Sequence, residues 1–233
     1  MRPVRFRAVV PAAGFGTRMD AGRPKQYLPL AGATVLDHAL RPLLAHPGLE
    51  RLVVAIAPGD LGFGELAVAS DPRVDAVTGG NTRAESVAAG LAALGAQDRQ
   101  AIVVVHDAAR PCLDAADLER LLAESTPPDG GLLAIPVRDT LKRADRDGRV
   151  ACTVDRAGLW QALTPQAFPL AVLRDALAAA VGAGAVTDEA AAMERAGHAP
   201  RLVEGNPANI KVTRPGDLPL AEAILAAREG RTQ

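Results

Sequence analysis

The sequence has few of the features that mark several large classes of protein. It holds two cysteines in 233 residues, too few to staple a fold of this size, and they fit a reducing compartment. Its net charge is −1, so no overall field attracts nucleic acid or an acidic membrane. No apolar run reaches membrane-spanning length, and the apolar stretch near the N-terminus is too short for a signal peptide. We therefore expect a soluble cytoplasmic protein that binds neither nucleic acid nor membrane.

The two most familiar phosphate-binding motifs are also missing, although a glycine loop follows the first apolar run. Residues 12–30 read AAGFGTRMDAGRPKQYLPL. A Walker loop requires GxxxxGK[ST], which does not occur here, and a dinucleotide fingerprint requires GxGxxG, where Met19 replaces the third glycine. The loop instead combines Gly14 and Gly16 with the cations Arg18 and Lys25. It is therefore a glycine loop of neither common type.

What the sequence does have is an alternation of strand-like and helix-like segments. Apolar residues make up 48% of the chain, enough for a sizeable core. Strands are predicted at 5–11, 50–58, 73–80, 100–111, 130–137 and 199–205, and helices at 34–46, 82–95, 114–125, 168–184, 187–197 and 215–230. Thr82 and Glu85 form a capping box, and Thr187 is expected to cap a later helix. The pattern predicts an α/β fold with a Rossmann-like, mostly parallel sheet covered by helices on both faces.

Residues 138–160 break this alternation. Two strand-like arms flank Asp147-Gly148, a strong signal for a two-residue hairpin turn. The segment is polar and lacks an apolar face that could pack on the main sheet. We expect a β-hairpin arm projecting from a single domain that spans residues 1–233. Because an isolated hairpin is marginal in water, we expect the same arm of a second subunit to hold it in a two-fold dimer.

The glycine loop suggests an anion site. Ligands of open parallel sheets sit at the carboxyl ends of strands, and this loop follows the first strand. Gly14 and Gly16 let backbone N–H groups approach an anion. Arg18 suits bidentate contact with phosphate oxygens, and Lys25 acts as a mobile point charge. These features favour a polyphosphate ligand, but the loop alone also fits a surface turn with solvated basic residues.

Other strand ends carry polar residues too. Gly79 and Gly80 follow one strand, and paired glycines allow a flat ring to lie against the backbone, although an ordinary strand-to-helix turn would look the same. Asp107 ends the central strand, and a carboxylate facing a polyphosphate makes sense mainly with a divalent metal between them. A helix cap or a salt bridge to Arg110 is the alternative. His106 fits a packed histidine better than a catalyst.

Eight short motifs, in order along the chain, give the sequence a specific resemblance. They are VVPAAGFGTRM, PKQYLPL, TGGNTRAESV, VHDAARP, DTLKR, LTPQ, TDEA and NIKVTRP. Together they resemble the 2-C-methyl-D-erythritol 4-phosphate cytidylyltransferase family of the non-mevalonate isoprenoid pathway, over essentially the whole chain. The resemblance implies transfer of CMP from CTP to the phosphate of methylerythritol phosphate, with release of pyrophosphate. It also implies magnesium as cofactor and a homodimer with shared active sites.

The resemblance assigns roles to residues of this chain. Asp107 matches the carboxylate near the magnesium. The implied catalytic residues are Arg18, Lys25, Arg156 and Lys211. The implied nucleotide-binding residues are Ala12, Ala13, Gly14, Gly16, Gly79, Gly80, Asn81, Arg83, Ser86 and Ala108. The residues implied to hold the acceptor are Thr140, Arg156, Thr164, Thr187, Lys211 and Thr213.

Other functions stay open at this point. Relatives often have an aspartate where this chain has Asn81, which keeps the hydrogen-bonding shape but loses the charge and so bears on base selectivity. A cytidylyltransferase for another polyol phosphate, such as ribitol 5-phosphate, would keep the glycine loop and differ at the arm, although DTLKR with TPQ favours methylerythritol phosphate. Sugar-1-phosphate nucleotidyltransferases usually carry a longer substrate domain. A non-catalytic nucleotide-binding module would need no cations at the α-phosphate.

Overall fold

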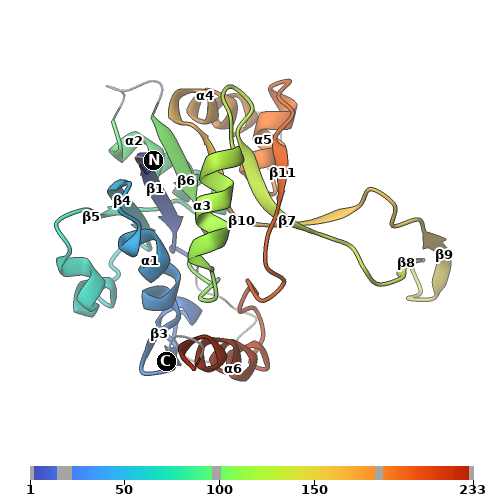
Figure 1. The fold of residues 1–233 in the computed structure, drawn as a ribbon, viewed down its shortest axis with the longest axis horizontal. Helices are drawn as coiled ribbons and strands as arrows, with labels where there is room; N and C mark the ends of the chain where they lie inside the picture. The colour runs from blue at the N-terminus through green and yellow to red at the C-terminus, as the bar shows by residue number, and fades with distance from the viewer. Residues whose placement is uncertain (1–2, 15–22, 96–100, 182–185, 231–233) are drawn as a thin grey trace.

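A seven-stranded sheet forms the centre of the molecule (Figure 1). The computed structural model describes residues 3–14, 23–95, 101–181 and 186–230, so Gly16 and Arg18 lie outside the described residues. The strand order is β11-β7-β10-β6-β1-β4-β5, and only β10 runs antiparallel to its neighbours among these strands. The predicted mostly parallel α/β fold is confirmed. The strands are β1 (Phe6–Pro11), β4 (Leu49–Ile56), β5 (Val74–Thr78), β6 (Ile102–Val105), β7 (Gly131–Pro136), β10 (Trp160–Pro169) and β11 (Arg201–Glu204).

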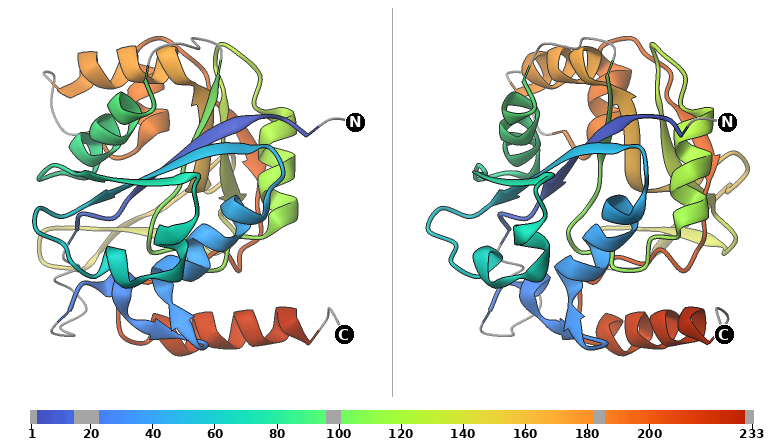
Figure 2. Two further views of the ribbon diagram at one scale, coloured as in Figure 1. Left: turned by 90° about the vertical axis from the view of Figure 1, so that its left-hand side faces the viewer. Right: turned by 60° about the vertical axis from the view of Figure 1, so that its left-hand side comes forward.

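Helices cover both faces of this sheet (Figure 2). On β1, Ala8 and Val10 belong to the core beneath α1 and α3, whereas Val9 belongs to the core beneath α2, α4 and α5. Successive side chains of a strand point to opposite faces, which explains why the strand segments are continuously apolar. No helix in the described segments combines the length and apolarity needed to cross a membrane. These helices are α1 (Val35–Ala45), α2 (Arg83–Ala93), α3 (Ala115–Glu124), α4 (Leu170–Val181) and α5 (Glu189–Arg195).

The last helix, α6 (Asp217–Glu229), packs at one end of the sheet with the small hairpin of β2 (Pro29–Leu30) and β3 (Ala33–Thr34). Val212 is buried in this small core, and its backbone N–H donates to the Ala109 carbonyl at 2.8 Å. The NIKVT segment forms neither a strand nor a helix, and the Val212 contact brings Lys211 beside the chain that follows β6. The described residues also form three short 3-10 helices, namely η2 (Lys25–Tyr27), η3 (Phe63–Glu65) and η4 (Ala67–Ser70).

Strand β10 is the main element that the sequence does not predict. Its middle holds Pro165 and the buried Gln166, which are atypical of a central strand, and the pairing with β7 shifts register there. The buried Gln166 side chain donates to the Asp188 carboxylate at 2.9 Å and accepts the Ala190 N–H at 2.9 Å. Contacts with α5 thus satisfy the polar groups that argue against a strand on sequence grounds.

The polar segment 138–160 forms the predicted arm. Strand β8 (Leu141–Ala144) pairs antiparallel with β9 (Val150–Val154), and Figure 1 shows the hairpin projecting away from the sheet. None of residues 138–160 is buried. The arm connects β7 to β10, two strands that are neighbours in the sheet. It therefore extends outward from the body without contributing to either core.

The tip of the arm differs from the prediction of a two-residue turn at Asp147-Gly148. The last paired residues are Ala144 and Val150, so the turn is longer, and Gly148 has a φ of 77°. The Asp145 carboxylate accepts the N–H groups of Asp147 and Arg149 at 3.0 and 2.8 Å. This side-chain bonding stabilises the wider turn.

The N-termini of α2 and α5 test the two predicted helix caps. Thr82 and Glu85 form the predicted capping box of α2, because the Thr82 hydroxyl accepts the Glu85 N–H and the Glu85 carboxylate accepts the Thr82 N–H, both at 3.1 Å. The predicted cap of α5 is wrong by one residue. Asp188, and not Thr187, is the N-cap, since its carboxylate accepts the Ala191 N–H at 3.0 Å. Thr187 is exposed just before the helix.

Candidate active site

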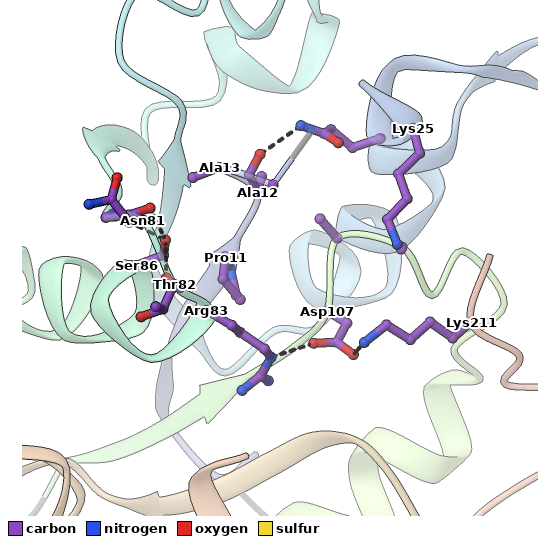
Figure 3. A pocket seen from close by; sticks show the side chains of 15 residues that line it. Pro11, Ala12, Ala13, Lys25, Asn81, Thr82, Arg83, Ser86, Asp107 and Lys211 are labelled. Carbon is purple, nitrogen blue, oxygen red and sulfur yellow. Dashed lines mark hydrogen bonds and ion pairs between the residues drawn. The ribbon is translucent and has the colours of Figure 1, made fainter. Parts of the chain in front are cut away.

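A cavity of about 340 Å³ opens where β1 and β6 end (Figure 3). This is the edge of a parallel sheet at which ligands are expected. Eleven predicted site residues line it, namely Ala12, Ala13, Gly14, Lys25, Gly80, Asn81, Arg83, Ser86, Asp107, Ala108 and Lys211. Sequence reasoning missed the four other residues of the lining, which are Pro11, Gln26, Thr82 and Ala109.

The turn between β5 and α2 forms one wall and depends on its two glycines. A Cβ atom at Gly79 would lie 2.8 Å from both the Ala13 Cβ and the Ser86 Oγ. At Gly80 it would lie 2.3 Å from the Glu85 Cβ. The Gly80 N–H donates to the Ser86 Oγ at 3.2 Å, which fixes the turn against the helix. Gly79 thus supports the wall from behind, while Gly80 faces the cavity.

Lys25 approaches the cavity from η2. Its ammonium donates to the Val212 carbonyl at 3.1 Å. The neighbouring Gln26 is buried, and its amide donates to the Ala12 carbonyl at 2.6 Å. Gln26 therefore ties Lys25 to the end of β1, a role that its place in the PKQY motif could have suggested. In Figure 3, Lys25 and Lys211 reach toward the same space from different elements.

Asp107 is the acidic residue of the cavity lining, and three cations surround its carboxylate. Its Oδ1 accepts from Arg83 Nε at 2.9 Å, and its Oδ2 lies 2.8 Å from Lys211 Nζ and 3.6 Å from Arg110 Nε. Burial alone would raise the pKa of Asp107, but Arg83, Lys211 and Arg110 outweigh it and hold the pKa well below its usual range. Asp107 is therefore ionised at neutral pH.

Arg83 is shared between two carboxylates. Besides its contact with Asp107, its Nη1 and Nη2 donate to the two oxygens of Glu189 at 2.6 and 2.9 Å. The Glu189 side chain is 1% exposed. Burial by itself would lower the pKa of Arg83, but Glu189 and Asp107 raise it above its usual range. Arg83 is thus a permanent cation whose guanidinium is held in place by the protein itself.

Thr164 lies in the wall behind Asp107 and is buried. Its hydroxyl oxygen accepts the Asp107 N–H at 3.0 Å and lies 3.1 Å from His106 Nδ1. The other ring nitrogen of His106 lies 3.2 Å from the Arg110 carbonyl, which can only accept, so Nε2 carries the proton and Nδ1 accepts from Thr164. Burial lowers the pKa of His106 to about 4, which keeps the ring neutral. The Thr164 hydroxyl therefore stabilises the wall by bonding the Asp107 backbone and His106, and it does not line the cavity.

The remaining predicted residues do not line the cavity. Thr140 and Arg156 are exposed on the arm, where the Arg156 guanidinium donates to the Arg138 carbonyl. The Thr213 hydroxyl donates to the Lys211 carbonyl at 3.2 Å. Among the described residues, one chain thus brings most of those predicted to bind a nucleotide together with Lys211, but not with the arm.

The lining has the charge of an anion site. Its described residues include three cations, Lys25, Arg83 and Lys211, against the single carboxylate of Asp107. Among the described residues, no group of three or more histidine, cysteine, aspartate or glutamate side chains could hold a metal. Magnesium commonly binds through one carboxylate and several phosphate oxygens, so Asp107 fits a metal that arrives on a nucleotide. Both Asp107 oxygens already contact cations, so the phosphates would supply most of the coordination.

Comparisons with known proteins point to one family over nearly the whole chain. Residues 6–227 match the sequence profile of 2-C-methyl-D-erythritol 4-phosphate cytidylyltransferase. A protein of that name from Escherichia coli O1:K1 is 57% identical over 221 residues, which cover 94% of this chain and 92% of the relative. A solved 4-diphosphocytidyl-2C-methyl-D-erythritol synthase superposes with a TM-score of 0.83 and 39% identity, over 95% of this chain and 99% of the other.

Another solved structure gives the same result. The 2-C-methyl-D-erythritol 4-phosphate cytidylyltransferase of Francisella tularensis is 32% identical, with a TM-score of 0.81, over 94% of this chain and 99% of its own. The match covers the sheet, the cavity and the arm in one continuous alignment range. The chain belongs to the 2-C-methyl-D-erythritol 4-phosphate cytidylyltransferase family.

Proposed function

We propose that the protein transfers CMP from CTP to 2-C-methyl-D-erythritol 4-phosphate, forming 4-diphosphocytidyl-2-C-methyl-D-erythritol and pyrophosphate in isoprenoid precursor biosynthesis. The observation that carries this proposal is the joining of Lys25, Lys211 and the glycine-lined walls in one cavity, in a chain of this family. A nucleotide-binding module without catalysis would have no need of cations from two separate elements at the same place.

The chemistry requires no general base. A phosphate oxygen of the acceptor attacks the α-phosphorus of CTP, the bond to the bridging oxygen breaks, and pyrophosphate leaves with the electron pair. The acceptor phosphate is already anionic near pH 7, because its second pKa is about 6. The buried, neutral His106 lies outside the cavity lining and is not needed. The difficulty is the repulsion between two anions, which fixed positive charges reduce.

The cavity residues divide this work. Lys25, with Arg18 of the same loop, neutralises charge that builds on the α-phosphate in the transition state. Lys211 lies next to Asp107 and receives the phosphate of the acceptor. Gly80 and Asn81 form the wall for the nucleobase, where an amide can both donate and accept.

The proposal includes a magnesium ion, and Asp107 is the residue that would hold it. When bound, the ion would neutralise triphosphate charge and orient the phosphates. Activity should disappear in excess chelator and return with added magnesium. Asp107→Ala should raise the magnesium concentration that gives half-maximal rate. Full turnover in excess chelator would exclude a metal requirement.

The proposal also includes a homodimer in which the arm completes the partner's site. Its support is that no residue of the arm is buried in the single chain, and that Val150 is 65% exposed. Thr140 and Arg156 would then contact the acceptor bound by the other subunit. The guanidinium of Arg156 suits bidentate contact with a phosphate.

The test of the function is pyrophosphate release with CTP, magnesium and each acceptor in parallel. Methylerythritol phosphate should give the highest kcat/KM, and ribitol 5-phosphate should give little product. Higher activity with ribitol 5-phosphate would move the assignment to the other polyol phosphate. Tight CTP binding without pyrophosphate release with either acceptor would favour a non-catalytic module. Parallel reactions with UTP would show whether Asn81 preserves selectivity for cytosine.

A further inference from the structure

Glu189 is a buried carboxylate that does not line the cavity itself but contacts Arg83, which does. It is the first residue of α5, and both of its oxygens accept from the guanidinium of Arg83, which is the first residue of α2. It is not part of the cavity lining. Such a residue influences the reaction only through the group that it holds.

The contact with Glu189 decides how Arg83 meets Asp107. Glu189 holds the terminal nitrogens, and in the resulting orientation of the guanidinium it is Nε that donates to Asp107, at Oδ1. The second oxygen, Oδ2, is then open to the Lys211 ammonium at 2.8 Å. The order Glu189–Arg83–Asp107–Lys211 thus runs from the interior to the cavity, and Figure 3 shows its last three members.

Removal of Glu189 would change this arrangement. A guanidinium and a carboxylate prefer a bidentate contact with two parallel N–H···O bonds. Without Glu189, the guanidinium of Arg83 would be free to turn, so that two of its N–H groups could pair with both oxygens of Asp107. Lys211 is 40% exposed and has a flexible side chain, so it would lose the partner that fixes its ammonium.

We propose that Glu189 is a positioning residue for the transfer reaction, which by holding Arg83 reserves one Asp107 oxygen for Lys211 and so places the Lys211 ammonium for the acceptor phosphate. This inference rests on the proposed function, because it takes Lys211 as the cation for the acceptor. Its effect should fall on the acceptor and not on CTP.

The charge of Glu189 alone predicts the opposite result. Loss of a negative charge makes the cluster more positive, and a more positive cavity attracts both anionic substrates more strongly. A purely electrostatic role would therefore lower KM for CTP and for the acceptor together. The positioning role raises KM for the acceptor selectively, so the two explanations differ in sign.

The experiment uses Glu189→Gln in the full-length enzyme with steady-state pyrophosphate release. The amide keeps the size of the side chain but cannot accept from both terminal nitrogens of Arg83. We expect KM for the acceptor to rise about tenfold, the equivalent of one charge-assisted hydrogen bond, and KM for CTP to stay within about twofold. The matched control is Glu194→Gln, an exposed residue of the same helix, which should match the wild type.

A double substitution tests the route of the effect. In a Lys211→Met background, adding Glu189→Gln should change KM for the acceptor by less than about twofold, because the group that Glu189 positions is gone. An independent structural role would instead add its full effect. Equal changes in both KM values, or an additive double variant, would overturn the proposal.

Two further outcomes keep the inference separate from the function itself. If wild-type enzyme fails to turn over methylerythritol phosphate, the proposed function fails, and this inference fails with it. If the wild type is active and Glu189→Gln behaves like the wild type, only the inference fails. Should Glu189→Gln not fold, Glu189→Asp keeps the charge but is one methylene shorter, and an acceptor KM equal to that of the wild type would overturn the proposal.

Discussion

The cavity and the arm are built in opposite ways. Around the cavity, charged groups are matched within one chain, as in the contacts of Arg83 with Asp107 and Glu189. On the arm, none of residues 138–160 is buried, and charged groups such as Arg143 and Arg149 face solvent. Both regions contain residues that the family resemblance assigns to the active site.

The difference shows which part of the site one chain can organise by itself. Buried ion pairs fix the charged groups around the cavity before any ligand binds. Moving any one of these charges would leave the others unpaired in a low dielectric. The arm has no comparable constraint and needs a second surface to hold its residues. The predictions below test this contrast, beginning with the largest expected effect.

The largest expected effect on activity is the loss of Lys25, which lies at the cavity. Lys25→Ala should lower kcat by about 10²-fold or more, because a preorganised cation at developing negative charge acts mainly in the transition state. Single-turnover rates with saturating CTP and acceptor measure this loss. Lys142→Ala on the arm is the matched control, and it should keep near-normal kcat. A Lys25→Ala variant with near-normal kcat would remove this residue from the catalytic set.

Low pH should lower the stability of the folded protein, because the buried His106 is neutral in the folded state. Burial lowers the pKa of His106 to about 4 from an ordinary value of 6.5, so between these values the unfolded chain binds a proton that the folded chain does not. Its contribution to stability is complete above pH 6.5 and is lost as pH falls toward 4, by about 3 kcal/mol.

Urea unfolding at several pH values measures this slope. His106→Gln keeps a donor for the Arg110 carbonyl but does not titrate, so the difference between wild type and variant should shrink as pH falls through this window. A constant difference would contradict the neutral, buried histidine.

Substitutions on the arm should change KM for the acceptor and not KM for CTP. Arg156→Ala should raise KM for the acceptor about tenfold and leave KM for CTP nearly unchanged, because the loss of one phosphate contact is of that size. At acceptor concentrations well below KM, where Arg156→Ala dimers are slow, mixing them with Lys25→Ala subunits should raise activity, since one of the two sites in a mixed dimer is intact. Equal amounts should give about a quarter of wild-type activity after complete exchange. A fully active monomer, or no rescue after confirmed exchange, would exclude the shared site.

Two glycines with similar backbone strain, one on the arm and one outside it, allow the stabilities of the two regions to be compared. Gly148 on the arm and Gly197 after α5 both have positive φ, 77° and 88°, and both have open space where a Cβ would lie. Alanine in this conformation costs about 1 kcal/mol. Gly197→Ala should lower the free energy of unfolding by about that amount, whereas Gly148→Ala should leave it nearly unchanged in a protein held as a monomer by dilution. Equal losses would show that the arm unfolds together with the body.

Much of the fold follows from short-range patterns in the sequence. The capping box of Thr82 and Glu85, the continuously apolar strands and the polar arm depend on neighbours along the chain, and each was predicted correctly. The sequence also predicted that Gly14 and Asp107 lie at one edge of the sheet, although β6 ends at Val105, several residues before the predicted strand does. Local propensity and hydrophobic period are sufficient for such features.

Three features depend on contacts between distant parts of the chain, and the sequence alone did not reveal them. Strand β10 holds buried Gln166 in the centre of the sheet because α5 satisfies its amide. The Thr164 hydroxyl is directed to His106, which lies 58 positions away in the sequence. Arg83 reads as a ligand contact in its motif, yet its main partner is Glu189, 106 positions away.

The sequence by itself determined most of the strands and helices, with β10 as the main exception, together with the glycine walls and most of the charged residues near the cavity. Only the tertiary structure decided which of those charges pair with each other and which face the ligand. The physical reason is that burying a charge is favourable only when a partner lies at the correct distance and angle. That geometry is a property of the packed elements, as the sharing of Arg83 between Glu189 and Asp107 shows.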